Sequence, residues 1–236
     1  MRVEPHGVGS VMHLIKRGAR GMDIVHDDHD RNRFISSLFY LNDSFSDENW
    51  VRAIEDVPFM TRPDYWPERD PLVHLFAWIL QNNHFHLLVQ EIREGGAAKF
   101  MQRIGGSMTV AHNAKYEEIG SLFQGAYKSK TVDEDSYVRY LAFYIQVKNV
   151  LEQRPGGLPR AIAEFDDAWE WALAFPYSSL GVYALGSDSP TSVIVEKTFL
   201  SEMFPDRVAL KKEAFEMLLT HAQHHEEHAP YLLEPW

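Results

Sequence analysis

The sequence contains no cysteine, which excludes a disulfide framework and any metal site built from thiolates. It also has no run of eighteen apolar residues, which excludes a membrane-spanning helix. The first ten residues lack the apolar stretch of a signal peptide. From these absences we expect a soluble, cytoplasmic protein that has no membrane partner.

Excess positive charge is also missing, because the formal net charge is -11, and this alone does not favour a nucleic-acid partner. The acidity lies towards the end of the chain: 13 acidic and 4 basic residues follow from Ala161 onward, whereas 21 and 19 precede it. The basic residues of the first part occur in small groups, which solvated surface charges would also produce. A nucleic-acid surface requires that these groups converge on one face.

The 236 residues, 45% of them hydrophobic, are enough for one well-buried domain with an appendage or for two small domains. Apolar periodicity predicts strands at residues 11–15, 73–80, 84–90 and 122–132, and helices at residues 30–41, 97–116 and 137–151. Residues 81–83 predict the short turn of a hairpin. This order indicates an α+β fold, an antiparallel sheet with helices packed on one face.

The chain divides into a main domain, residues 1–186, and an acidic helical C-terminal extension, residues 187–236. Within the main domain, residues 42–70 are polar and contain three prolines, which predicts a loop-rich insertion with at most one short helix. Residues 169–185 are aromatic and turn-rich. The extension carries His221, His224, His225 and His228 at helical spacing, but the intervening Glu226 and Glu227 favour a solvated helix end over a metal site.

Two histidines separated by one residue, His84 and His86, lie in the second strand of the predicted hairpin, residues 84–90. Alternate residues of a strand point to the same face, so both imidazoles project together and could bind one divalent cation. A His-x-His pattern is short, however, and ordinary strand histidines would give it equally well.

The helix at residues 137–151 carries Tyr137, Tyr140, Tyr144 and Lys148 on one face. These tyrosines could be core aromatics whose hydroxyls reach water. Alternatively, one of them is a nucleophile towards phosphorus, which would need a nearby cation. In the strand before this helix, Lys128 and Lys130 have the same parity and would emerge on one face, either as solvated charges or as contacts to a phosphate backbone.

Five motifs, in this order, resemble those of the REP-associated tyrosine transposases, a branch of the single-tyrosine HUH transposases. They span about residues 11–186, and the sequence carries them as His13-Leu-Ile-Lys-Arg-Gly with Asp27-Asp-His-Asp-Arg, Asn82-Asn-His-Phe-His-Leu-Leu-Val, Leu122-Phe-Gln-Gly-Ala-Tyr-Lys-Ser, Phe143-Tyr-Ile before Lys148-Asn-Val, and Phe175-Pro-Tyr-Ser-Ser.

The resemblance implies a ferredoxin-like sheet on which His84 and His86 hold Mg²⁺ or Mn²⁺ next to Tyr144. It implies that Tyr144 cuts single-stranded DNA beside a hairpin through a 5′-phosphotyrosine intermediate and transfers the strand. The DNA contacts that we expect are Arg17, Arg20, Lys128, Lys130 and Lys148. Relatives occur as monomers and as homodimers.

The sequence departs from the family at the residue one turn after the tyrosine, where an amide commonly serves as a third metal ligand. That residue is Lys148, whose ammonium cannot ligate a cation. Asn149 or Gln146 could replace it, although Asn149 lies about 100° further around an α-helix. The departure leaves two alternatives open: a catalytically impaired, domesticated protein that still binds DNA hairpins, and an unrelated metal-dependent hydrolase that uses the histidine pair.

Overall fold

A four-stranded antiparallel sheet lies at the centre of the protein. The structure, a computed structural model, describes residues 7–132, 134–186, 189, 191–203 and 206–233. The strands are β1 (Val11–Arg17), β2 (Val73–Leu80), β3 (His84–Glu91) and β4 (Lys128–Val132), and their order in the sheet is β2-β3-β1-β4. β2 and β3 form the predicted hairpin, while β1 pairs with both β3 and β4.

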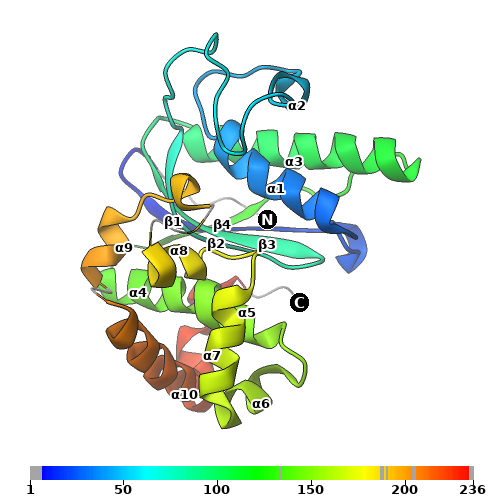
Figure 1. Cartoon of the computed structure of the whole chain (residues 1–236). Coiled ribbons are helices and arrows are strands. Elements are labelled where there is room, and N and C mark those ends of the chain that lie inside the picture. Colours follow the sequence, from blue (N-terminus) through cyan, green and yellow to red (C-terminus); the bar gives the residue numbers. More distant parts are fainter. Residues whose placement is uncertain (1–6, 133, 187–188, 190, 204–205, 234–236) are drawn as a thin grey trace.

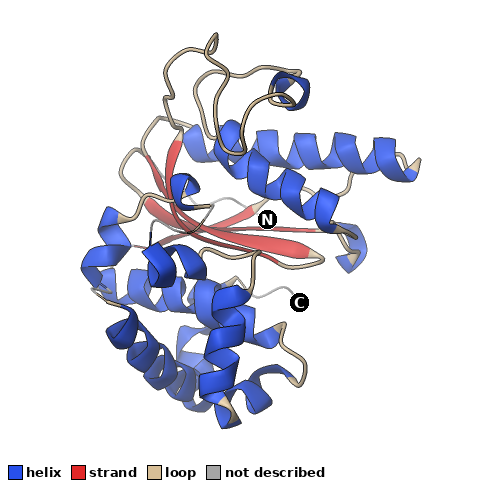
Figure 2. Cartoon of the chain, viewed as in Figure 1, coloured by secondary structure: helices blue, strands red, loops and turns tan. Residues whose placement is uncertain are grey.

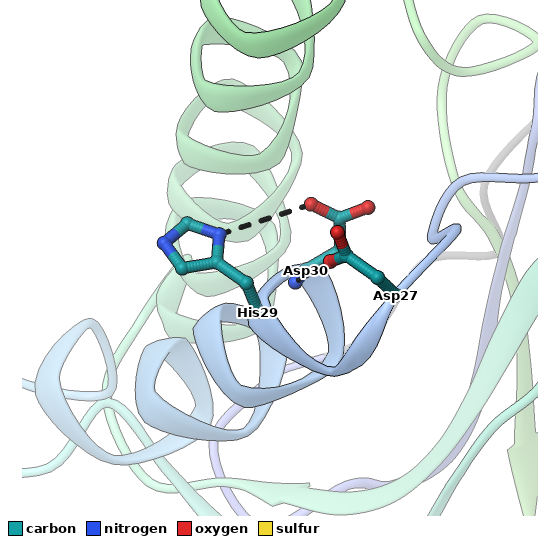
Figure 3. Close-up of side chains that lie close together, drawn as sticks. All are labelled: Asp27, His29 and Asp30. Carbon is teal, nitrogen blue, oxygen red and sulfur yellow. Dashed lines mark hydrogen bonds and ion pairs between the residues drawn. The ribbon is translucent and has the colours of Figure 1, made fainter.

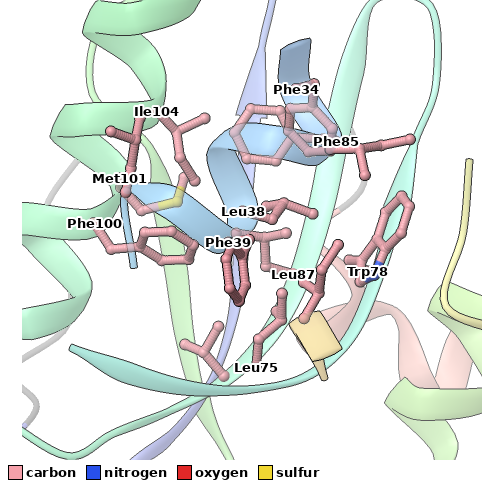
Figure 4. Close-up of a cluster of buried hydrophobic side chains, with 14 of the residues drawn as sticks. Phe34, Leu38, Phe39, Leu75, Trp78, Phe85, Leu87, Phe100, Met101 and Ile104 are labelled. Atoms are coloured by element: carbon pink, nitrogen blue, oxygen red, sulfur yellow. The ribbon is translucent and has the colours of Figure 1, made fainter. Parts of the chain in front are cut away.

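One face of the sheet is covered by α1 (Asp28–Tyr40) and α3 (Gly96–Tyr116), which lie above the strands in Figures 1 and 2. Their apolar stripes pack on the odd-numbered side chains of β3, and Figure 4 shows Phe85 and Leu87 reaching up to Phe34 and Leu38 of α1. α1 begins at Asp27, whose carboxylate accepts a hydrogen bond from the amide of Asp30.

A second layer of helices covers the opposite face and forms a second apolar core. Its elements are α4 (Asp135–Phe143), a π-helical turn η2 (Tyr144–Lys148), α5 (Asn149–Glu152), α6 (Gly157–Ala163), α7 (Phe165–Ala174), α8 (Leu180–Leu185), α9 (Thr198–Met203) and α10 (Arg207–Leu232). α9 and α10 contribute Leu200, Leu210 and Leu218 to this core, so residues of the predicted extension pack directly on α4 and its neighbours.

The α+β class and the antiparallel sheet are confirmed, but the expectation that helices pack on one face only is wrong. Both faces of β3 are apolar beyond its histidines: Phe85 and Val89 point to the first layer, and Leu88 points to the second. Each face therefore needs its own helical cover to leave water.

Two local predictions are corrected. The strand expected at residues 122–132 starts only at Lys128, because Gly125 has a φ of 74° and Phe123 makes just an isolated bridge with Gly18. Residues 169–185 are mainly helical, in α7 and α8, and these helices bury Trp169, Leu173 and Leu180 in the second core.

Three short elements complete the described part of the chain: η1 (Ala19–Gly21), α2 (Trp50–Ala53) and η4 (Ser192–Ile194). α2 is the one helix within residues 42–70, a segment that reaches the first core through Trp50, Met60 and Trp66. Across the described residues, none of the helices combines the length and the apolar character needed to cross a bilayer.

Candidate active site

Three histidines share the face of the sheet that the second helical layer covers. His84 and His86 alternate along β3, as the strand period predicts, and His13 lies on β1. Arg17 pairs with His84, and Ile15 with His86, across the antiparallel ladder. Directly opposite residues of paired strands project to the same side, so Ile15 and Arg17 share the side of His84 and His86. His13 lies two residues before Ile15 on the same strand and therefore projects to this side too. We call this side of the sheet the histidine face.

The tyrosine helix crosses the histidine face and places one phenol against the imidazoles. The Tyr144 ring centroid lies 5.8 Å from that of His86 and 6.3 Å from that of His13. Tyr144 is only 1% exposed. A third imidazole, that of His221 on α10, also has its ring centroid 6.2 Å from that of Tyr144, so the phenol is surrounded by polar rings. The phenol thus stands at the polar centre of an otherwise apolar layer.

The π-helical turn η2 begins at Tyr144 and changes which residue follows it around the helix. The backbone N–H of Asn149 donates a hydrogen bond to the Tyr144 carbonyl, which lies five residues earlier instead of the four residues of an α-helix. Asn149, and not Lys148, therefore lies one turn beyond Tyr144, which corrects the α-helical phase assumed from the sequence. π-turns of this kind are frequent at functional sites.

Asn149 and Gln146, the two amides considered as third ligands, have different surroundings. Asn149 is 2% exposed, and its Nδ2 has no hydrogen-bond partner among the described residues. Gln146 uses its Oε1 to accept a hydrogen bond of 3.1 Å from the Ser179 hydroxyl, which itself bonds to β2. Of the two side chains, Asn149 is the one whose amide is not committed to a neighbouring element.

Lys148 is buried inside the site and is not a surface cation. Its Nζ lies 4.8 Å from the Tyr144 ring centroid and 2.7 Å from Glu152 Oε1. The Glu152 side chain is 38% exposed, so the pair connects the buried phenol with solvent. A positive charge therefore stands next to Tyr144 where the sequence alone suggested a DNA contact.

The electrostatics keep the imidazole of His86 neutral. Burial lowers the pKa of His86 well below its ordinary value, and the nearby His13, His84 and Lys148 lower it further. A neutral imidazole is the form that ligates a metal ion. The imidazoles of His84 and His86 and the buried amide of Asn149 make a donor set that fits a divalent cation such as Mn²⁺ or Mg²⁺, with positions left for phosphate oxygens and water.

Four of the predicted DNA-contacting residues lie at the edge of the histidine face or beside it. Lys128 and Lys130 of β4 pair with Ile15 and His13, so both project to the histidine face. Arg17 projects to it opposite His84. Arg20 is exposed in η1, immediately after β1, with a left-handed φ of 56°. These basic residues converge near the imidazoles although the chain as a whole is acidic.

Residues 69–148 match the family model described as "Transposase IS200 like". The matched segment contains β2, β3, α3, β4, α4 and η2, and so includes His84, His86 and Tyr144. This segment, about a third of the chain, is therefore similar to the IS200-like transposases. A solved structure of a REP-associated tyrosine transposase bound to a REP hairpin is similar at 12% sequence identity and a TM-score of 0.43, covering 78% of this chain and 83% of that one. No curated protein matches the chain.

A second group of side chains of the kinds that bind metals lies outside the matched segment, at the start of α1. Figure 3 shows Asp27, His29 and Asp30 close together, with ligand atoms within 4.8 Å of one another. The Lys115 ammonium already lies 2.6 Å from Asp27 and 2.7 Å from Asp30. Burial acts to raise the pKa of Asp30, but hydrogen bonds from Lys115 and Tyr116 hold it below its ordinary value. This group is a helix cap joined to α3 by an ion pair.

Sequence reasoning missed three residues that contact the candidate site. His13 was noted only as part of a motif, although its parity on β1 could have placed it opposite the histidine strand. Asn83 was assigned only to the hairpin turn. His221 was expected on a solvated helix end, but it is buried, and its Nδ1 lies 2.5 Å from the Tyr140 hydroxyl. The side chains of His224, His225 and His228 lie outside the described residues.

Proposed function

We propose that the protein is a metal-dependent transposase-type endonuclease and strand transferase that cuts single-stranded DNA beside a hairpin. The observation that carries this proposal is the meeting of the Tyr144 phenol with the imidazole of His86 on one face of the sheet. The two residues are far apart in the sequence, and both fall in the segment that matches the IS200-like transposases.

Tyr144 is the nucleophile in this proposal. Its oxygen forms a bond to phosphorus while the bond between phosphorus and the 3′ oxygen breaks. The phenol gives up its proton to water, and the departing 3′ oxygen takes up a proton from water. The product is a 5′-phosphotyrosine, which keeps the phosphodiester energy for transfer to another 3′-hydroxyl. The partly buried basic neighbours of the site, Arg17, Lys128 and Lys130, would neutralise flanking phosphates.

His84 and His86 would hold Mg²⁺ or Mn²⁺, with the Asn149 amide as third ligand after rotation of its oxygen towards the imidazoles. A divalent cation supplies charge stabilisation to the phosphate and orients its oxygens. The buried position of Tyr144 implies that DNA enters by displacing part of the helical cover, because a nucleophile has to reach the phosphorus atom.

The test is a covalent-adduct assay on a labelled single-stranded oligonucleotide that carries a hairpin, with Mg²⁺ or Mn²⁺ present. We expect a denaturant-resistant protein–DNA band with the wild-type protein and none with Tyr144→Phe. The matched control is Tyr140→Phe, which removes a phenolic oxygen one turn earlier, bonded to His221, and should keep the adduct. Absence of an adduct from the wild-type protein, or its persistence in Tyr144→Phe, would show that the proposed chemistry is wrong.

The ion pair between Lys148 and Glu152 favours a second candidate, a DNA-hairpin-binding protein with impaired cleavage. A fixed positive charge beside the imidazoles opposes the binding of a divalent cation. Hairpin binding of equal affinity with Mg²⁺ and with a chelator, without any adduct, would support this second function.

A further inference from the structure

A cavity of about 340 Å³ lies beside the first half of β2, and we call it the β2 cavity. It is lined by the two ends of the loop-rich insertion, by the start of β2 and by residues 193–197, which precede α9. Ile79, the partner of His86 in the sheet, follows Val73 by six residues. At about 3.3 Å per residue this places the cavity roughly 20 Å along the strand from the candidate active site. The β2 cavity is therefore a separate site.

Arg69 brings a positive charge into the β2 cavity. Its Nε is buried and has no hydrogen-bond partner among the described residues. The guanidinium lies 4.7 Å from the centroid of the Phe39 ring. Burial lowers the pKa of Arg69, and the attraction of Asp43, which forms its own ion pair with Arg62, only partly offsets this. A buried donor without an acceptor costs free energy, and an oxyanion in the cavity would supply that acceptor.

The charged groups of the β2 cavity sum to a single positive charge. Arg69 and Lys197 each carry +1, Glu196 carries -1, and His74 is counted as neutral. The Glu196 carboxylate already accepts a hydrogen bond of 3.0 Å from the N–H of Thr198, at the start of α9. One excess positive charge matches a singly charged carboxylate better than a doubly charged phosphate group.

Apolar side chains make up the rest of the wall of the β2 cavity. Leu75 and Val195 are buried there, whereas Val193 is 48% exposed. Sites for small molecules typically combine such an apolar lining with a few polar groups that fix the orientation of the ligand. The lining therefore fits a molecule that has an apolar body next to its charged group.

Hydrogen bonds hold the wall of the β2 cavity in place before any ligand binds. The N–H of Glu196 donates to the Leu75 carbonyl at 2.9 Å, which fixes residues 193–197 against the outer edge of β2. The Asn42 side chain accepts from the N–H groups of Leu72 and Val73 and donates to the Val73 carbonyl. A preformed site has little freedom to lose on binding, which favours affinity for a small ligand.

We propose that the β2 cavity binds a small monocarboxylate with a short apolar body. The guanidinium of Arg69 receives the carboxylate through its planar fork of N–H donors, whose geometry matches this group. The apolar body lies against Leu75 and Val193. Because the ligand contacts the insertion, β2 and the segment before α9, its binding stabilises the folded chain by mass action. The site is independent of the proposed DNA chemistry.

Titration calorimetry on the full-length protein tests the chemistry of the ligand, with hexanoate as the probe. Hexanamide has the same apolar body without the charge and should bind at least about tenfold more weakly. Acetate keeps the charge, lacks four methylene groups and should also bind at least about tenfold more weakly. Inorganic phosphate distinguishes a phosphate site from a carboxylate site and should bind more weakly than hexanoate. No binding of hexanoate, or binding of any of the other three as tightly as hexanoate, would overturn the proposal.

Substitutions in the wall test the position of the ligand. Arg69→Gln should weaken hexanoate binding at least about tenfold and leave hexanamide binding unchanged. Arg52→Gln is the matched control, because Arg52 is exposed on α2 in the same insertion and its loss changes the net charge equally; it should bind hexanoate as the wild type does. Since Arg69 also packs on Phe39, Val193→Asp provides a second variant, in which a negative charge at an exposed part of the wall should weaken hexanoate binding more than hexanamide binding. Wild-type affinity for hexanoate in Arg69→Gln, or in Val193→Asp when Arg69→Gln does not fold, would overturn the proposal.

Discussion

Replacing Lys148 by methionine should tighten the binding of Mn²⁺, because the ammonium lies inside the proposed metal site. Its Nζ is 4.8 Å from the Tyr144 ring, and that ring is 5.8 Å from the His86 ring, so the ammonium lies within about 11 Å of the His86 imidazole. Methionine keeps the length and apolar character of the stem and removes only the charge.

The size of the effect follows from the Coulomb energy. Charges of +1 and +2 at about 11 Å repel by about 3 kcal/mol when the effective dielectric constant is about 20. Counterions and the solvent around the part-exposed Glu152 screen this repulsion. We therefore expect Lys148→Met to increase Mn²⁺ affinity by at least about tenfold, which corresponds to about 1.4 kcal/mol.

Titration calorimetry with Mn²⁺ at low ionic strength tests this expectation against Lys99→Met. Lys99 is an exposed lysine of α3, the helix that covers the opposite face of the sheet, so this variant changes the net charge equally without altering the site. Lys148→Gln makes the same charge change and adds a ligating amide, so any gain beyond Lys148→Met measures the ligand. Equal affinities for Lys148→Met and Lys99→Met would refute the reasoning.

Three further predictions concern the rest of the molecule. Phe85→Ala, at a fully buried ring 4.9 Å from that of Phe34, should lower the free energy of unfolding by about 3–5 kcal/mol in urea titrations; a loss below about 1 kcal/mol would contradict the two-layer packing. Because the pKa of Asp30 is lowered in the fold, its stabilisation is present at neutral pH and is lost as the pH falls below about 4. Lys115→Met should therefore destabilise the protein at pH 7 and progressively less as the pH falls below about 4, and a loss that does not decrease with falling pH would exclude this ion pair as the cause. Replacing Lys128 and Lys130 together by alanine should reduce the slope of log affinity for single-stranded DNA against log salt by about 1.4, and an unchanged slope would place the DNA elsewhere.

Local patterns in the sequence were sufficient for the elements that carry the candidate site. The alternation in β3 placed His84 and His86 on one side, and the run of apolar residues around Tyr144 predicted a helix there. The parity of Lys128 and Lys130 correctly put both on one face of β4. These properties depend on residues within a few positions of each other, which is the range over which backbone periodicity acts.

Other features depend on how the elements pack and could not be obtained from periodicity. An α-helical phase places Lys148 one turn beyond Tyr144, whereas the π-turn places Asn149 there. The sequence could not predict this, because the one extra residue in a π-turn leaves no clear pattern in the sequence. The burial of His221 against Tyr140 depends on the return of α10 to the sheet, some eighty residues later.

The sequence by itself determined the α+β class, the hairpin with its paired histidines and the helix that carries Tyr144, since each follows from side-chain period and turn chemistry. Tertiary structure alone decided that helices cover both faces, that His13 contacts His86, and that Lys148 stands beside the phenol instead of on the surface. Strand register and helix packing set these contacts, and both are chosen by the collective burial of apolar surface from distant segments, which no local stretch of residues encodes.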